Sequence, residues 1–231
     1  MVENNDMKLV SDENGLALVA DGQTLRGDFT KMIPRVKQGA ISKELLARAA
    51  KIKDTDKPLV AIDATAGLGD DSLILAAAGF HVKMFERNPV IHELLEDAIK
   101  RAAEIPELTE IVSRMELKHG DSVEAMKHLD FVPDVILLDP MFPERQKSAL
   151  VKKKLQVIQK LEIPCADEAD MILTAMEAKP KKLIIKRPPK GPYLAGLKPD
   201  FSIEGKAVRF DGFASPYERL EKFRKTVNVE G

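Results

Sequence analysis

Acidic side chains and glycines stand together in the segment from Asp63 to Gly69, whose sequence is DATAGLG. The segment follows the apolar run 59–62 and precedes a helical pattern. Gly67 and Gly69 let the backbone approach a ligand closely, because glycine has no Cβ and tolerates a positive φ. A strand that ends in an acid and a glycine turn and then enters a helix predicts a nucleotide-binding unit.

The residues after this turn indicate which nucleotide it can hold. Gly69 is followed by Asp70, Asp71 and Ser72, so the third glycine of a dinucleotide fingerprint is missing, and no Gly-Lys-Ser/Thr sequence follows. Two carboxylates at a helix N-terminus would repel phosphates, which disfavours NAD and ATP. A cationic or zwitterionic nucleoside such as S-adenosylmethionine (SAM) suits the turn better. Asp70 or Asp71 can accept a hydrogen bond from its ammonium group, although both also suit helix capping, worth about 1 kcal/mol.

Acids also follow the next two expected strands. Glu86 ends the first of them, where a carboxylate is the expected ligand of a ribose diol; an ion pair with Arg87 is the alternative. Asp121 and Ser122 follow the second, where an acid can accept a hydrogen bond from an adenine amino group, although Asp is also common in turns. Glu86 supports nucleoside binding without separating NAD from SAM.

The fourth expected strand leads into Asp139-Pro140-Met141-Phe142. Ligands of open α/β sheets bind at the carboxyl ends of the strands, where this segment is expected to lie. The stretch resembles the Asp/Asn-Pro-Pro-Phe/Tyr motif of SAM-dependent amino-group methyltransferases, with Met141 in place of the second proline. The resemblance implies that Asp139 and the Pro140 carbonyl accept hydrogen bonds from a target –NH2 and that Phe142 stacks on its ring. A turn after a buried strand explains Pro140 but not a charged Asp139 that closes an apolar run.

With these motifs the chain resembles the small-subunit ribosomal RNA guanine-N2 methyltransferase J family, as a somewhat divergent member. The resemblance covers roughly residues 60–209, and its most specific parts are 63–69, 86–89, 138–143, 146–153 and 185–188. It implies a class I, Rossmann-like SAM-dependent methyltransferase that methylates the exocyclic N2 amine of a guanosine in 16S ribosomal RNA. The implied partner is ribosomal RNA or the small ribosomal subunit. The SAM-binding candidates are Asp63, Gly67, Gly69, Asp70, Asp71, Glu86, Arg87, Asp121, Ser122 and Asp139.

Basic residues are concentrated after the fourth and fifth expected strands, although the net charge of the chain is −1. Between Lys179 and Lys198 there are seven Lys or Arg residues and no Asp or Glu. Local basic blocks in a neutral protein favour a polyanion-facing surface, and a solvated face balanced by acids elsewhere is the alternative. The residues expected to contact RNA phosphates are Lys147, Lys152, Lys153, Lys186 and Arg187.

Three other functions share part of this pattern. A SAM-dependent methyltransferase that acts on a small molecule or a protein would use the same cofactor residues and would differ in the use of the basic blocks. A non-catalytic RNA-binding protein on the same fold would not need Asp139 at a strand end. An NAD-dependent oxidoreductase is disfavoured by the missing glycine and the acidic turn.

Composition sets the class of protein. The 231 residues are 44% apolar and 32% charged, which suits one large domain or a domain with a small appendage. No run approaches the roughly 18 apolar residues of a membrane span, and the first ten residues do not resemble a secretory signal. The single Cys165 fits a reducing compartment, so we expect a cytoplasmic protein. The four histidines lack Cys partners at ligand spacing, so no metal site is expected. The oligomeric state stays open.

The elements that must position these residues alternate along the chain. Residues 1–57 predict a separate extension, with a hairpin of 16–19 and 23–26 and a helix over 42–51 that Ser42 caps. Residues 58–231 predict the methyltransferase domain, an α/β fold with a doubly wound, mostly parallel sheet. The expected strands are 59–63, 81–86, 115–119, 134–138 and 182–186, with helices over 70–78, 89–104, 123–128, 147–161 and 167–178 and a last hairpin over 201–212.

Overall fold

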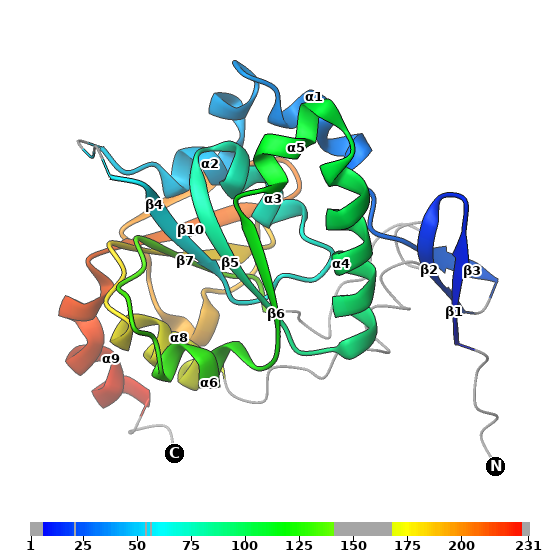
Figure 1. The fold of residues 1–231 in the computed structure, drawn as a ribbon. Helices are drawn as coiled ribbons and strands as arrows, with labels where there is room; N and C mark the ends of the chain where they lie inside the picture. Colours follow the sequence, from blue (N-terminus) through cyan, green and yellow to red (C-terminus); the bar gives the residue numbers. More distant parts are fainter. Residues whose placement is uncertain (1–6, 21, 54, 56, 141–167, 228–231) are drawn as a thin grey trace, which may run out of the picture.

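A seven-stranded sheet forms the centre of the computed structural model, which describes residues 7–20, 22–53, 55, 57–140 and 168–227 (Figure 1). The strand order is β6-β5-β4-β7-β8-β10-β9. The strands are β4 (Leu59–Asp63), β5 (Phe80–Glu86), β6 (Met115–His119), β7 (Val135–Leu138), β8 (Lys182–Arg187), β9 (Phe201–Glu204) and β10 (Arg209–Ala214). The pairs from β6 to β8 are parallel, whereas β10 is antiparallel to β8 and β9. The predicted doubly wound, mostly parallel sheet is therefore confirmed.

Strand register brings the chemistry-bearing segments to one edge of the sheet. Asp63 at the end of β4 pairs with Leu137 of β7, two residues before Asp139, and with Met84 of β5, two residues before Glu86. All four residues of β7 are buried, as expected for a strand that is covered on both faces. The carboxyl ends of these strands therefore lie next to one another.

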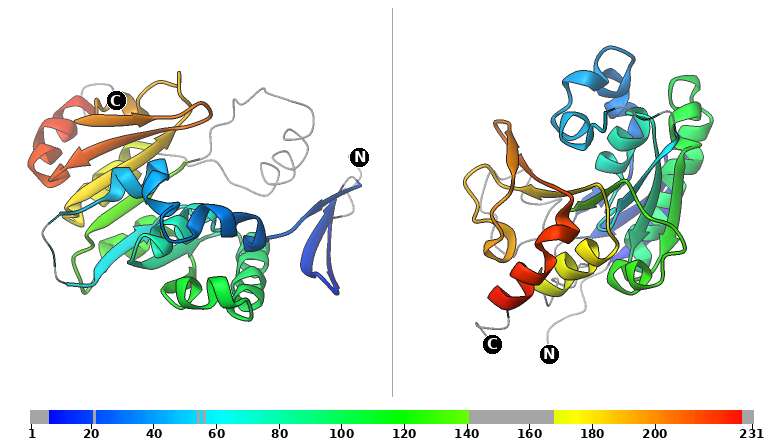
Figure 2. Two further views of the ribbon diagram at one scale, coloured as in Figure 1. Left: turned by 90° about the horizontal axis from the view of Figure 1, so that it is seen from above. Right: turned by 90° about the vertical axis from the view of Figure 1, so that its left-hand side faces the viewer.

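Helices cover both faces of the sheet, as the two further views in Figure 2 show. One face packs against α3 (Asp70–Ala77), α4 (Pro89–Ala103) and α5 (Pro106–Val112), whose buried residues include Leu73, Leu95 and Leu108. The other face packs against α6 (Ser122–Lys127), α8 (Glu168–Glu177) and α9 (Leu220–Val227), through residues that include Met126 and Ile172. Short helical turns η3 (Leu194–Gly196) and η4 (Pro216–Arg219) lie between the last elements.

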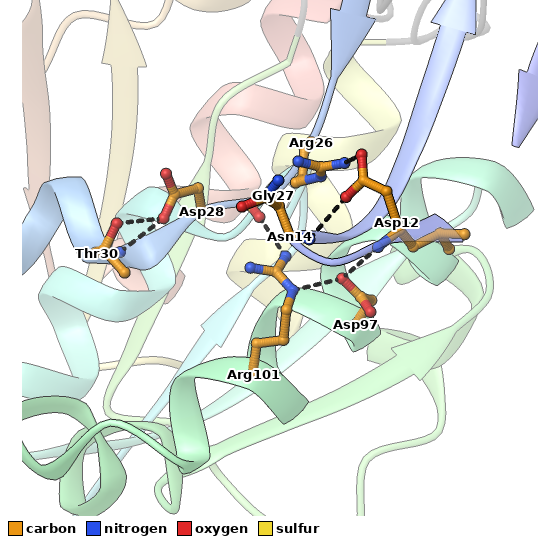
Figure 3. Close-up of polar contacts among 9 residues, drawn as sticks. Asp12, Asn14, Arg26, Gly27, Asp28, Thr30, Asp97 and Arg101 are labelled. Atoms are coloured by element: carbon orange, nitrogen blue, oxygen red, sulfur yellow. Dashed lines mark hydrogen bonds and ion pairs between the residues drawn. The ribbon is translucent and has the colours of Figure 1, made fainter. Parts of the chain in front are cut away.

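The first described residues form a small antiparallel sheet of β1 (Lys8–Asp12), β2 (Gly15–Ala20) and β3 (Gln23–Leu25), which projects beyond α4 in Figures 1 and 2. The hairpin of β2 and β3 is confirmed, and β1 adds an exposed third strand. Leu18, Ala20 and Leu25 pack on Ile91 and Leu94 of α4. Polar contacts to α4 hold the same sheet: Asp97 accepts from the Leu16 amide at 3.0 Å, and Arg101 donates to the Gly27 carbonyl at 2.6 Å (Figure 3).

The helix expected over 42–51 is divided in two. A turn η2 (Ile41–Lys43) precedes α2 (Leu45–Ala50), and the residue at the N-cap of α2 is Glu44. The prediction that Ser42 caps a continuous helix is wrong, because the Ser42 hydroxyl lies within η2 and donates to the Gly39 carbonyl at 3.3 Å. Upstream of this turn lie η1 (Phe29–Met32) and α1 (Ile33–Val36).

The apolar core continues across the expected boundary at residue 57. Phe29, Leu46 and Ala49 belong to the same buried cluster as Leu73 of α3 and Phe210 of β10. A division into 1–57 and 58–231 stays a prediction about the organisation of the chain. The elements that were not expected include β1, α1, α5 and α9. The helix predicted over 147–161 lies outside the described residues.

Two absences apply to the described part of the chain alone. No helix there combines the length and apolar character that a membrane crossing requires. The described residues also contain no group of three or more His, Cys, Asp or Glu side chains that could hold a metal ion.

Candidate functional site

Hydrogen bonds join the ends of the central strands into one edge. Ala64 of the β4 turn donates to the Leu137 carbonyl of β7 at 3.1 Å, and Ala66 donates to the Phe85 carbonyl of β5 at 3.1 Å. A side chain adds to these backbone bonds, because the Thr65 hydroxyl accepts from the Asp139 amide at 2.8 Å. The glycine turn is therefore fixed against the segment that carries Asp139.

The two glycines of the turn have left-handed backbone conformations, with φ of 55° at Gly67 and 84° at Gly69. A Cβ on Gly69 would lie 2.6 Å from Leu95 Cδ1 and 2.9 Å from Phe29 Cζ, so this glycine is needed for close packing. Among the described residues, a Cβ on Gly67 would meet only the Thr65 carbonyl oxygen, at 3.9 Å. Gly67 thus borders open space at the strand edge, where a ligand can approach the backbone.

The buried Asp63 side chain holds the glycine turn in place through hydrogen bonds. It is 1% exposed, and its carboxylate accepts from the Thr65 amide at 3.1 Å and from the Ser72 hydroxyl at 2.6 Å. Burial raises the pKa of Asp63 to about 7, although the hydrogen bond from Ser72 works in the opposite direction. The carboxylate thereby ties the end of β4 to the first turn of α3.

Glu86 stands at the end of β5, where the sequence predicts a ribose ligand. It is 7% exposed, and its two oxygens accept from the Gly67 amide at 3.0 Å and the Asn88 amide at 2.7 Å. Burial raises the pKa of Glu86, while the hydrogen bonds from Asn88 and Gly67 lower it. Each carboxylate oxygen has two lone pairs, so these bonds leave acceptor capacity for a hydroxyl group. The neighbouring Arg87 is exposed.

Asp121 and Ser122 begin α6. Asp121 is exposed and caps this helix, because its carboxylate accepts from the Val123 amide at 2.7 Å. Ser122 is buried, with 7% of its surface exposed. Capping is the role that the structure shows for Asp121, and its contact with an adenine amino group stays a prediction.

The two acids at the start of α3 have different surroundings. Asp70 is exposed, whereas Asp71 forms an ion pair with Lys186 of β8. The same Lys186 ammonium group lies 2.9 Å from Oδ2 of Asp139. Burial opposes the charge on Lys186, but Asp71 and Asp139 outweigh it and hold the pKa of the ammonium group above its ordinary value. Lys186 therefore connects α3, the helix that follows the glycine turn, to Asp139, which is predicted to accept a hydrogen bond from the target amine.

The residues expected to contact RNA fall into two groups. Lys186 and Arg187 are within the described residues, and neither is an isolated cation that faces outward. Lys186 pairs with the carboxylates of Asp71 and Asp139. Arg187 is 2% exposed and donates to the Pro192 carbonyl at 2.8 Å. The burial of Arg187 does not support a phosphate contact, since its guanidinium group is enclosed by protein. The predictions for Phe142, Lys147, Lys152 and Lys153 lie outside the described residues.

Two contributors to the site were missed at the level of sequence. Thr65 links the glycine turn to the Asp139 amide, and Ser72 donates to Asp63. Their positions carried a signal, because hydroxyl side chains within or just after a glycine turn are well placed to bond to nearby backbone and carboxylate groups. The double ion pair of Lys186 had no local signal, since its partners are distant in sequence.

The arrangement fits SAM. The turn offers open space at Gly67, the buried Glu86 carboxylate has acceptor capacity, and acids replace the positive groups that phosphates would need. Counted along the chain from β4, the central sheet has the order 3-2-1-4-5-7-6, with the seventh strand antiparallel. This fold and site define a class I, Rossmann-like SAM-dependent methyltransferase.

Comparisons with known proteins identify the family. A family model described as "Putative SAM-dependent methyltransferase" matches residues 1–215. The ribosomal RNA small subunit methyltransferase J of Marinobacter nauticus is 40% identical over 217 residues, which are 91% of this chain and 78% of that protein. The protein of the same name from Nitrosococcus oceani is 45% identical over 195 residues, 82% of this chain and 76% of its own length. The chain therefore belongs to the ribosomal RNA small subunit methyltransferase J family.

Solved structures share the fold. The crystal structure of a SAM-dependent methyltransferase from Neisseria gonorrhoeae is similar with a TM-score of 0.72 and 31% identity, over 93% of this chain and 86% of that one. The ribosomal RNA methyltransferase aviRa from Streptomyces viridochromogenes shares the fold, with a TM-score of 0.53 at 15% identity over 80% of this chain and 88% of that one.

Replacing Glu86 with alanine is expected to raise the Kd for SAM at least about tenfold, equivalent to about 1.4 kcal/mol. The variant loses the proposed ribose acceptor and leaves the Gly67 and Asn88 amides without their carboxylate partner. Isothermal titration calorimetry measures the affinity, with NAD titrated in parallel and expected not to bind. Glu93→Ala on the exposed side of α4 is the control. A folded Glu86→Ala protein that binds SAM within twofold of the parent would contradict the ribose assignment.

Proposed function

We propose that this protein transfers a methyl group from SAM to the exocyclic N2 amine of a guanosine in the 16S RNA of the small ribosomal subunit. Two kinds of observation support the proposal. The relatives that cover most of the chain carry the name ribosomal RNA small subunit methyltransferase J. The described part of the site has an acid, Asp139, next to the glycine turn, where the target amine needs a hydrogen-bond acceptor.

The placement of Asp139 is the observation that carries the chemistry. Its backbone amide donates to Thr65 within the glycine turn at 2.8 Å, and its side chain is 29% exposed. A partly exposed carboxylate beside a cofactor turn can receive a substrate group while it stays oriented by the protein. A purely RNA-binding protein has no use for this arrangement at the end of a buried strand.

The residues around the amine act by orientation and by charge. Asp139 and the Pro140 carbonyl accept hydrogen bonds from the target –NH2 and turn its lone pair away from conjugation with the base. When bound, SAM supplies an electrophilic methyl group. Transfer of that methyl group to nitrogen would release S-adenosylhomocysteine and a proton, and Asp139 or water would take the proton. Alignment of this kind is worth on the order of 7–11 kcal/mol, and the carboxylate also stabilises positive charge that develops on nitrogen.

The SAM-binding set of the proposal combines residues from the ends of β4, β5 and β6. Glu86 binds the ribose, Asp121 and Ser122 contact the adenine side, and Asp70 receives the ammonium group. Arg87 lies exposed beside Glu86. Asp63, Gly67 and Gly69 shape the turn, and Asp71 acts through its ion pair with Lys186.

RNA recognition in the proposal relies on base stacking and on basic side chains. The target guanine must leave its stack, at a cost of a few kcal/mol, and stacking on Phe142 returns about 1–3 kcal/mol. Lys147, Lys152 and Lys153 contact phosphates. Because the substrate is part of the ribosome, we place the activity in the cytoplasm.

Methylation of purified small subunits tests the proposal. We expect the protein to transfer labelled methyl groups from SAM to small subunits, or to naked 16S RNA, from a strain that lacks its own J-type enzyme. Nucleoside digestion and mass spectrometry should then find the label in N2-methylguanosine. Subunits that already carry the methyl group and large-subunit RNA are the controls. Label at another amine would correct the target position, and no transfer to RNA by a protein that binds SAM would point to a small-molecule or protein substrate.

A further inference from the structure

The ammonium group of Lys186 lies between the helix after the glycine turn and Asp139, the proposed hydrogen-bond acceptor of the target amine. Lys186 stands near the end of β8, and its Nζ pairs with Asp71 in the first turn of α3 and with Oδ2 of Asp139, at 2.9 Å in the second case. These three residues come from three separate parts of the chain, and only the fold brings them together. The lysine side chain is 24% exposed, so solvent screens these pairs only partly.

A phosphate-binding role does not fit this geometry. A lysine that holds RNA phosphates presents its ammonium group outward, whereas this one donates to two carboxylates. Moving Lys186 toward a phosphate would break its ion pairs with both Asp71 and Asp139. Asp70 adds a further acidic group at the same turn. The arrangement therefore opposes release of the lysine.

We propose that Lys186 is a positioning residue for methyl transfer, which holds the Asp139 carboxylate ionised and oriented toward the substrate amine by clamping it to the start of α3. This inference rests on the proposed function and adds a residue to it. With Oδ2 of Asp139 bound to Lys186, rotation of the carboxylate about its side-chain bond is restricted. The same ammonium group links Asp139 to α3, the helix that follows the glycine turn. Asp139 and the glycine turn are therefore held as one rigid unit.

The charge of Lys186 has a predictable effect on pH dependence. A nearby positive charge favours the ionised form of a carboxylate. In the part of the chain that the structure describes, the acids near Lys186 and Asp139 are Asp71 and Asp70 on α3 and Asp63 at the end of β4, and Arg35 of α1 is a cation near Asp70 and Asp71. Without the lysine these acids would favour protonation of Asp139. Loss of Lys186 should therefore shift the acidic limb of the kcat profile to higher pH.

Lys186→Met tests the inference. We expect kcat to fall about tenfold or more, the Kd for SAM to stay within about threefold, and the acidic limb of the kcat profile to move upward by about one pH unit. Lys186→Arg keeps the charge and should restore the position of the acidic limb. Lys181→Met is the control, since Lys181 also pairs with an acid, Asp134, but at the opposite end of β8. Thermal unfolding of each variant checks folding, and Lys186→Gln replaces Lys186→Met if the latter does not fold.

A double-mutant cycle decides whether Lys186 acts through Asp139. In an Asp139→Asn background the carboxylate charge is gone, so Lys186→Met should change kcat by less than about threefold. Losses that multiply would show that the lysine acts elsewhere and would overturn the inference. An unchanged kcat and pH profile in the single variant would overturn it as well.

Failure of the proposed function would look different. If the parent protein methylates no RNA under any condition, the function itself fails, and Lys186 is not at issue. If the parent is active and Lys186→Met matches it in kcat and pH profile, only the role of Lys186 fails. Calorimetric SAM titration provides a readout that does not depend on RNA.

Discussion

Substitution of Asp139 with alanine should lower kcat for methyl transfer at least about a hundredfold, while SAM still binds within about threefold of the parent affinity. Removal of one preorganised group that stabilises developing charge typically costs 10²–10³ in rate, about 2.7–4 kcal/mol. Asp139 is proposed to combine this stabilisation with orientation of the amine. Single-turnover transfer of labelled methyl groups to small subunits, with enzyme in excess, measures the chemical step.

Two further variants sharpen this prediction. Asp139→Asn keeps an oxygen acceptor and the shape of the side chain, so its loss should be smaller than that of Asp139→Ala. Asp130→Ala removes an exposed acid from the loop before β7 and should leave kcat unchanged. If Asp139→Ala binds SAM and loses less than tenfold in rate, Asp139 is not the amine acceptor.

Gly69→Ala should lower the free energy of unfolding by about 2–5 kcal/mol and raise the Kd for SAM. The added Cβ meets two costs. A left-handed φ of 84° costs a non-glycine residue about 1–2 kcal/mol. Contacts of 2.6 Å with Leu95 Cδ1 and 2.9 Å with Phe29 Cζ force α3, α4 or η1 to move, and overpacking of this kind costs about 1–3 kcal/mol. Movement of α3 also displaces the turn that holds the cofactor.

Gly79→Ala is the matched control for this substitution. Gly79 follows the C-terminal end of the same helix with a φ of 98°, and a Cβ there meets no atom of the described residues within 4 Å. It therefore carries the backbone cost alone. Denaturant unfolding should show a larger loss for Gly69→Ala, and calorimetry should show weaker SAM binding for that variant only. Equal losses in both variants would mean that the neighbours of Gly69 relax without cost.

The parallel core of the fold was predictable because each strand is a short apolar run bounded by clear breaks. The expected bounds of 59–63 and 115–119 match β4 and β6. By contrast, β1 is exposed along its whole length and therefore lacks the alternation that marks a half-buried strand. The helix α5 did carry a signal, since Pro106 occupies its first position. In α9, buried Leu220 and Phe223 are three residues apart, which is also helical spacing.

The placement of the candidate residues at the sheet edge was predictable only where one strand end determines a position. Asp63, Glu86 and Asp139 follow from the rule that ligands bind at the carboxyl ends of parallel strands. Lys186 and Arg187 could not be assigned in this way, because adjacent residues of a strand point to opposite faces and the sequence does not say which face meets acids. The structure gives Lys186 two carboxylates and Arg187 a backbone carbonyl.

The position of α2 has a consequence for how the chain folds during synthesis. Its buried Leu46 and Ala49 share a core with Phe210 of β10, and Leu45 lies against Gly205. Part of the apolar face of α2 is therefore covered only after strands near the C-terminal end of the chain have been synthesised. At about 5–20 residues per second, translation from Ala50 to Arg209 takes on the order of 10–30 s. During that interval α3, which also packs against α2, is already made, but the side of α2 that faces β9 and β10 has no partner strands. We expect a ribosome stalled before β10 to hold the nascent protein with that side of the helix uncovered.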